Sequence, residues 1–164
     1  MTNQLELSKK LGDALLKRQW RCAVAESCTG GGVSALITEV PGSSQWFERG
    51  FVTYTNQSKT ELLQVPHDLL ASEGAVSEAV VRAMAEGALM ASHAEITVAV
   101  SGIAGPGGGS AEKPVGLVWF AWSQREGSTS TASYCFKGNR SSIRSQAVCA
   151  ALEGMLSVLD TMKT

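Results

Sequence analysis

The stretch of residues 26–32, ESCTGGG, decides the fold of this chain. It follows an apolar run at residues 22–25, typical of a buried strand, and precedes an apolar segment of helical spacing at residues 33–40. A strand, a glycine-rich turn and a helix in this order place backbone N–H groups at a helix N-terminus, where they face whatever binds there. Three glycines let the backbone approach a ligand closely. The pattern predicts a ligand cradle in the turn, with Ser27 as one candidate nucleophile.

Strands and helices alternate along the rest of the chain. Leucines at i, i+4 predict a first helix over residues 3–19. Further segments predict strands at 47–55, 95–100, 114–122 and 129–136, and helices at 56–64, 77–92 and 139–160. About five strands and four or five helices in mixed order predict an α/β protein. We expect a single layered domain over residues 1–164, with a mixed β-sheet covered by helices.

The composition excludes several classes of protein. The 164 residues, 44% apolar and 18% charged, are enough for one globular domain with a full core. A net charge of −1 gives no general attraction to nucleic acid or to an anionic membrane, so we expect neither as a partner. Residues 1–10 carry no signal-peptide pattern, and no run approaches the roughly 18 apolar residues of a membrane span. Four widely spaced cysteines favour reduced thiols in a cytoplasmic protein.

Two histidines limit the possible catalytic chemistry. His67 precedes Asp68 in a connecting segment, and His93 ends a predicted helix, so neither lies beside a glycine-rich loop. A Ser-His-Asp triad stays open, but surface positions account for both histidines. No pair of histidines or cysteines has metal-ligand spacing, and we expect no metal site.

Lys59 is the residue that points most directly to catalysis. With Asn56 as the N-cap of the helix 56–64, Lys59 falls at position N3, where the helix dipole favours the neutral amine that a general base needs. Tyr54 lies just before this helix and Ser44 ends a loop upstream. A Ser/Lys/Tyr set can transfer an acyl group without histidine. The alternative is a solvated lysine on a helix.

A second glycine-rich loop, residues 101–110, follows the strand 95–100. Neither glycine loop carries the nucleotide signatures G-x-x-x-x-G-K-[ST] or G-x-G-x-x-G. Loops at the carboxyl ends of strands converge on a ligand crevice, so we expect both loops to face one site. Arg140 lies in the first turn of the last helix, with Lys137 and Arg144 nearby, and indicates a phosphate-binding cluster. A solvated basic patch is the alternative.

Five motifs together connect the chain with a known family. They are AESCTGG (25–31), GSS (42–44) with FVTYTN (51–56) and Lys59, GAVS (74–77), SGIAGP (101–106) and KPVG (113–116). In combination they resemble the CinA C-terminal domain family over nearly all of the sequence. The likeness is strongest to the stand-alone bacterial form of this domain.

The resemblance implies hydrolysis of the carboxamide of nicotinamide mononucleotide, giving nicotinic acid mononucleotide and ammonia, in pyridine nucleotide salvage. It implies a small nucleotide substrate, no metal or organic cofactor, and a homodimer or higher homo-oligomer. A non-catalytic nucleotide-binding or regulatory paralogue of the same fold remains the alternative.

The resemblance also assigns roles to single residues. By motif, the catalytic set falls on Ser44 as nucleophile, Lys59 as its base and Tyr54 as an assistant in proton transfer. The residues that would hold the substrate or the oxyanion are Ser27, Thr29, Gly30, Gly31 and Ser101, with Arg140 meeting the phosphate. Ser27 remains the second candidate for the nucleophile.

Overall fold

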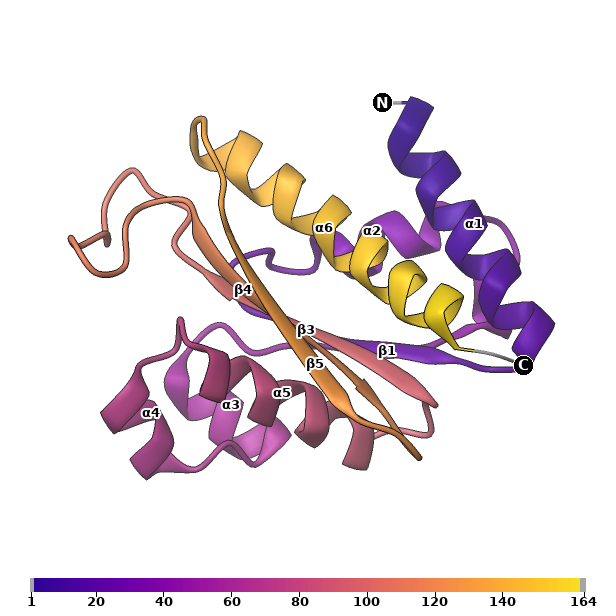
Figure 1. Cartoon of the computed structure of the whole chain (residues 1–164), viewed down its shortest axis with the longest axis horizontal. Coiled ribbons are helices and arrows are strands. Elements are labelled where there is room, and N and C mark those ends of the chain that lie inside the picture. Colours follow the sequence, from indigo (N-terminus) through magenta and orange to yellow (C-terminus); the bar gives the residue numbers. More distant parts are fainter. Residues whose placement is uncertain (1, 163–164) are drawn as a thin grey trace.

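Residues 2–162 are described by the computed structural model, and within them a five-stranded sheet carries helices on both faces (Figure 1). The strands are β1 (Cys22–Glu26), β2 (Phe47–Val52), β3 (Ile96–Gly102), β4 (Leu117–Gln124) and β5 (Thr129–Cys135). The helices are α1 (Thr2–Arg18), α2 (Gly32–Thr38), α3 (Asn56–Leu63), α4 (His67–Glu73), α5 (Glu78–Met90) and α6 (Arg140–Thr161), with a 3₁₀ helix over Ser43–Gln45. The predicted α/β class and mixed sheet are confirmed.

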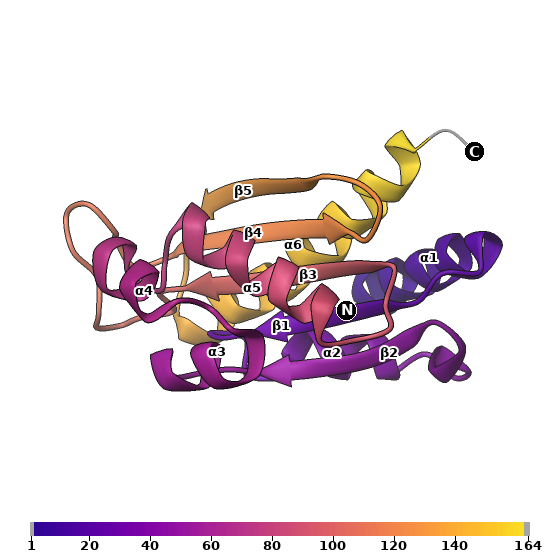
Figure 2. The same cartoon turned by 90° about the horizontal axis from the view of Figure 1, so that it is seen from below.

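The strand order is β2-β1-β3-β4-β5, with β2, β1 and β3 parallel and the last two strands antiparallel. Figure 2 shows the three parallel strands pointing the same way. Their carboxyl ends therefore meet at one edge of the sheet, which we call the carboxyl edge. In open α/β sheets this edge is where ligands bind.

Two apolar cores lie on the two faces of the sheet. The larger core packs α1, α2 and α6 against one face, with Leu11, Phe120 and Leu152 fully buried. The smaller core packs α3, α4 and α5 against the other face, around residues such as Met84. Every residue of β1 is buried, because a central parallel strand is covered on both faces. No helix in residues 2–162 is both long and apolar enough to cross a membrane.

Some element boundaries differ from those that the sequence predicted. The strand expected over residues 47–55 ends at Val52, because its neighbour β1 ends at Glu26 and the last pairing bond is Thr53 N–H to Glu26 O, 2.8 Å. The connecting segment that contains His67 and Asp68 forms the helix α4. The strand expected from residue 114 begins at Leu117 as β4.

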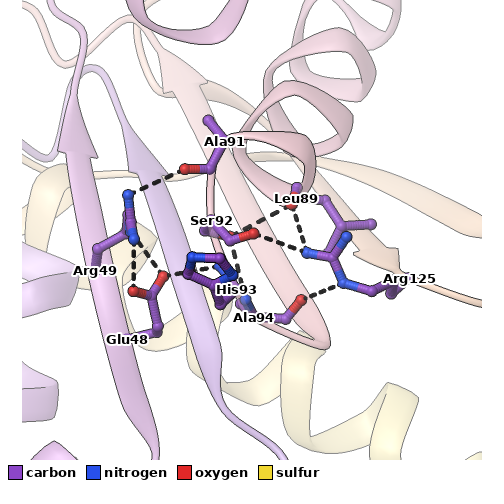
Figure 3. Close-up of polar contacts among 8 residues, drawn as sticks. All are labelled: Glu48, Arg49, Leu89, Ala91, Ser92, His93, Ala94 and Arg125. Atoms are coloured by element: carbon purple, nitrogen blue, oxygen red, sulfur yellow. Dashed lines mark hydrogen bonds and ion pairs between the residues drawn. The ribbon is translucent and has the colours of Figure 1, made fainter.

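At the opposite edge of the sheet, where the parallel strands begin, two arginines bind carbonyl oxygens at the C-terminal end of α5 (Figure 3). Arg125 donates to the carbonyl oxygens of Leu89 (2.6 Å) and Ser92 (3.0 Å). Arg49 donates to Ala91 O at 3.1 Å and pairs with Glu48. Guanidinium groups satisfy the last carbonyls of a helix and complement its dipole. This edge is therefore held by structural contacts.

A close approach between α3 and α5 fixes the position of α3. A Cβ at Gly87 of α5 would lie 2.0 Å from the carbonyl oxygen of Leu63 in α3. Only glycine fits at such a contact, because a side chain would force the two helices apart. Lys59 lies on α3, so this contact also determines where the lysine stands relative to the sheet.

Candidate functional site

Three hydroxyl-bearing residues form a row where the parallel strands end. Glu26 is paired with Val52 of β2 and Val100 of β3, so Ser27, Thr53 and Ser101 are the next residues on neighbouring strands. Ser27 N–H donates to Val100 O at 3.0 Å, which continues the pairing past the end of β1. Residues paired in register point to the same face of a sheet, so this row faces the α3–α5 side. Ser27 lies at its centre.

The Lys59 ammonium nitrogen reaches this row from α3. Its Nζ lies 2.9 Å from Ser27 Oγ, 2.7 Å from Thr53 O and 3.4 Å from Tyr54 O. Lys59 is 1% exposed, which is rare for a lysine without a carboxylate partner. The structure therefore pairs a buried lysine with Ser27, in hydrogen-bond contact with its hydroxyl.

Burial lowers the pKa of Lys59 from its ordinary value of 10.5 to about 8. Removal from water disfavours the charged ammonium, while the nearby Cys28 works weakly in the opposite direction. Burial is thus the main cause of the lowered pKa, where the sequence pointed to the helix dipole. The N-cap is Thr55 rather than Asn56, and Thr55 forms a capping box with Ser58, so Lys59 stands one position later than N3.

A cavity of about 280 Å³ opens beside the pair, near the lower end of the size range for small-molecule sites. Ser27, Tyr54, Lys59, Ser101 and Arg140, five of the residues predicted from sequence, line it. Its other walls come from the two glycine loops and from the segment before α5: Cys28, Ala75, Val76, Gly102, Ile103, Ala104, Gly105, Gly107 and Gly108. The expected convergence of both glycine loops is confirmed.

Tyr54 and Arg140 stand together at the mouth of the cavity. Arg140 Nη2 donates to the Tyr54 hydroxyl at 3.2 Å, and Arg140 Nη1 donates to Gly105 O at 2.8 Å. The Tyr54 side chain is 59% exposed. Within the described chain its hydroxyl contacts neither Ser27 nor Lys59; only its carbonyl accepts from the lysine. The geometry thus separates a buried Ser27–Lys59 centre from an exposed aromatic and cationic rim.

The buried carboxylate of Glu26 shapes the glycine turn that follows β1. Its oxygens accept hydrogen bonds from Val33 N–H (2.8 Å), Ser34 N–H (3.0 Å), Ser34 Oγ (2.8 Å) and Thr29 Oγ1 (2.6 Å). The last residue of β1 thereby satisfies the first N–H groups of α2, whose own N-cap, Gly31, provides no side-chain bond. The sequence reading missed this role, although an acidic residue before a helix was its signal.

Three residues of the turn, predicted to hold the substrate or the oxyanion, do not line the cavity, so their side chains do not hold the substrate; the backbone N–H of Thr29 stays a candidate for the oxyanion. The Thr29 hydroxyl is bound to Glu26, and Thr29 is 1% exposed. Gly30 and Gly31 have φ of 58° and 104°, and they face Arg144 and Val52 instead of the cavity. The glycines serve the left-handed backbone of the turn, which a side chain would strain.

Ser44 is not part of this site, so the prediction that it shares a centre with Lys59 is wrong. Ser44 lies in the 3₁₀ helix before β2, exposed, and β2 begins beside Cys22, the first residue of β1. Ser27 and Lys59 lie beyond the other end of these strands. Six strand residues at about 3.3 Å each separate Ser44 from the carboxyl edge by roughly 20 Å. Ser44 is close to Tyr54 in the sequence, but the whole length of β2 lies between them, and the sequence alone did not show this distance.

Within residues 2–162, neither Cys28 nor the two histidines form a competing catalytic centre. Burial raises the pKa of the Cys28 thiol to about 11, so Cys28 lines the cavity in its unreactive thiol form. His67 and His93 are exposed and lie outside the cavity lining. A larger groove of about 410 Å³ between α3 and α5 is lined mainly by apolar side chains such as Leu62 and Met90, with Glu86 as its ionisable residue.

Comparison with known proteins gives a consistent family. The model of the CinA C-terminal domain matches residues 4–159. The nicotinamide-nucleotide amidohydrolase PncC of Escherichia coli K12 is 52% identical over 149 residues, which are 91% of this chain and 90% of that protein. A CinA-like protein of Akkermansia muciniphila is 53% identical over 92% of this chain, but only over 36% of its own length. The crystal structure of the competence/damage inducible protein CihA from Agrobacterium tumefaciens superposes with a TM-score of 0.93 at 44% identity, covering 96% of both chains.

The Glu26 carboxylate makes a testable contribution to stability. In Glu26→Gln an amide N–H₂ must face N–H donors, so part of the four-bond cluster is lost. We expect the free energy of unfolding to fall by about 3 kcal/mol, because bonds to charged groups contribute about 1.5–3 kcal/mol each. Denaturant unfolding followed by circular dichroism measures this change. Glu39→Gln, at the exposed end of the same helix, is the matched control and should be near neutral; equal losses in both variants would contradict the role of Glu26.

Proposed function

The chain belongs to the CinA C-terminal domain family, and from this membership and the Ser27–Lys59 pair we propose that it hydrolyses the carboxamide of nicotinamide mononucleotide. The products are nicotinic acid mononucleotide and ammonia, and the reaction serves pyridine nucleotide salvage. The carrying observation is the 2.9 Å contact between Lys59 Nζ and Ser27 Oγ inside the cavity. The name of the E. coli relative supplies the substrate.

Ser27 acts as the nucleophile and Lys59 as its base. Neutral Lys59 takes the proton of Ser27 Oγ while the oxygen attacks the carboxamide carbon, and a tetrahedral intermediate forms. The lysine ammonium then gives that proton to the amide nitrogen, the C–N bond breaks, and ammonia leaves an ester on Ser27. Water attacks this ester, Lys59 takes a proton from the water and returns it to Ser27 Oγ, and the acid is released. One lysine thus serves as base and acid in both halves of the reaction.

Backbone N–H groups of the glycine turn receive the negative charge of the intermediate. Cys28 and Thr29 directly follow the nucleophile, and within the described residues neither N–H has a hydrogen-bond acceptor. Ser27 N–H and Gly30 N–H are already engaged, with Val100 O and Ser27 O respectively. Free, fixed N–H donors beside a nucleophile are what stabilisation of an oxyanion requires.

The rim of the cavity binds the rest of the nucleotide. Arg140 meets the phosphate, since its guanidinium stands at the mouth and offers donors in a fork that matches phosphate oxygens. Tyr54, in contact with Arg140, lines the same mouth and contributes to substrate binding. We assign the proton transfers to Lys59 alone, because the Tyr54 hydroxyl bonds to the rim arginine.

The nucleophile is identified by comparing Ser27→Ala with Ser44→Ala. We expect Ser27→Ala to lower kcat for nicotinamide mononucleotide by about 10³-fold or more, as for other serine nucleophiles. Ser44→Ala should keep the turnover of the parent protein, because Ser44 lies at the far edge of the sheet. Ammonia release measures both. A parent protein that binds the nucleotide by calorimetry without releasing ammonia would instead support a non-catalytic paralogue.

The buried lysine predicts the pH dependence of the reaction. The pKa of Lys59 in the folded protein is lowered to about 8, and the neutral amine is the active form, so kcat/KM should rise with pH and level off above about pH 8. At pH 7 about a tenth of the lysine is neutral, which is far more than at its ordinary pKa. The profile is measured from pH 6.5 to 10. A rise that continues toward pH 10 would rule out a lysine with a lowered pKa as the base.

Arg140 predicts a preference for the phosphorylated substrate. In Arg140→Gln the loss of charged hydrogen bonds should lower kcat/KM for the mononucleotide by about 10- to 100-fold. The same substitution should lower kcat/KM for nicotinamide riboside much less, since the riboside has no phosphate and is affected only through the contacts of Arg140 with Tyr54 and Gly105. Equal losses for the two substrates would contradict the phosphate role. Lys137→Gln, an exposed residue three positions before Arg140 and outside the cavity lining, is the control for a general effect of charge.

A further inference from the structure

Arg144 binds the glycine turn from α6. Its Nε donates to Cys28 O at 3.1 Å, and its Nη2 donates to Thr29 O at 3.2 Å. Arg144 is half-buried on α6 and does not line the cavity. The sequence predicts that Arg144 belongs to a phosphate-binding cluster of cationic side chains around Arg140. The structure instead engages Arg144 with two consecutive carbonyl groups of the protein.

The bond to Cys28 O orients the peptide that carries the Thr29 N–H, and the bond to Thr29 O orients the peptide that carries the Gly30 N–H, which in turn donates to Ser27 O. In a planar trans peptide the carbonyl and the following N–H point in opposite directions. With Cys28 O turned toward Arg144, the N–H of Thr29 points away from the guanidinium. Ser27 O accepts from Gly30 N–H at 3.1 Å, so the N–H of Cys28 points away from the inside of the turn. The same two N–H groups are those without an acceptor among the described residues.

Unpaired N–H groups at a buried position are uncommon in folded proteins. Thr29 is 1% exposed and Cys28 is 8% exposed, and Cys28 lines the cavity that receives the substrate. Gly30 allows the arrangement, because a Cβ there would lie 3.4 Å from Arg144 Nη2 at a φ of 58°. The turn, the glycine and the arginine together hold two donors that directly follow Ser27 in the chain and have no acceptor among the described residues.

We infer that Arg144 is a positioning residue for amide hydrolysis, which holds the N–H groups of Cys28 and Thr29 in place for the oxyanion of the tetrahedral intermediate. This inference rests on the proposed function. Arg144 touches no reacting atom; it acts through the two carbonyls that it binds. Arg140 lies one helical turn earlier and binds Gly105 of the other glycine loop, so one helix orients both loops.

The chain offers a matched control for this proposal. Arg18 is also half-buried and also donates to two carbonyl oxygens, Ala14 O at 3.2 Å and Leu159 O at 2.6 Å. Leu159 lies fifteen residues after Arg144 on α6, about 22 Å along the helix. Arg18→Gln therefore removes comparable bonds far from the cavity. Any loss that comes from general destabilisation appears in both variants.

The experiment measures kcat and KM for nicotinamide mononucleotide, together with Tm, in Arg144→Gln, Arg144→Lys and Arg18→Gln. We expect Arg144→Gln to lower kcat by about 10- to 100-fold with little change in KM, because misplaced donors act on the transition state and not on the bound substrate. Arg144→Lys, which keeps a cationic donor, should recover part of kcat and keeps the test informative if Arg144→Gln does not fold. Arg18→Gln should keep kcat.

The outcomes separate this inference from the proposed function. Turnover in the parent protein with an unchanged kcat in Arg144→Gln would overturn the positioning role alone. A rise in KM at constant kcat would also overturn it, because it would mean that Arg144 binds the substrate. Equal losses of kcat in Arg144→Gln and Arg18→Gln would also overturn the positioning role, because they would mean that Arg144 contributes only to the stability of the fold. A folded parent protein without ammonia release would overturn both proposals.

Discussion

The turn after β1 depends on the buried carboxylate of Glu26. Four donors converge on it, from the turn and from the first residues of α2. A buried carboxylate is costly unless its oxygens are satisfied, and here each bond also satisfies a group that the chain would otherwise leave unpaired. The cluster ties the turn, with its left-handed backbone at Gly30 and Gly31, to the first residues of α2, directly after Ser27 at the end of β1.

Lys59 is the counterpart of Glu26 on the other face of the sheet. Its amine is held by a hydroxyl and two carbonyls, with Ser27 and Thr53 nearest, so it is hydrogen-bonded without an opposite charge to keep it protonated. Burial therefore lowers its pKa toward the range in which an amine serves as a base. The same burial needs the close contact of Gly87 with Leu63, which places α3 against α5.

Helix α6 links the two halves of the site. It begins at the carboxyl edge and runs across the sheet toward the other edge (Figure 1). Arg140 binds the second glycine loop at Gly105, and Arg144 binds the first at Cys28 and Thr29. At the opposite edge of the sheet, Arg49 and Arg125 bind carbonyl oxygens at the end of α5 (Figure 3).

The sequence by itself determined the α/β class, most of the elements, the two glycine loops, and Lys59 and Arg140 as residues of interest. These follow from local patterns of apolar spacing, glycine and capping residues, which need no knowledge of distant contacts. Only the tertiary structure decided which serine meets Lys59. Ser44 is nearer to Lys59 in sequence, but it precedes β2, whereas Lys59 follows β2, so the two lie at opposite edges of the sheet. Ser27 follows β1, which runs parallel to β2, and therefore lies at the same edge as Lys59. The same holds for the burial that lowers the pKa of Lys59 and for the hydrogen bonds of Arg144 to Cys28 O and Thr29 O. Both depend on segments that meet only when the sheet and the helices pack.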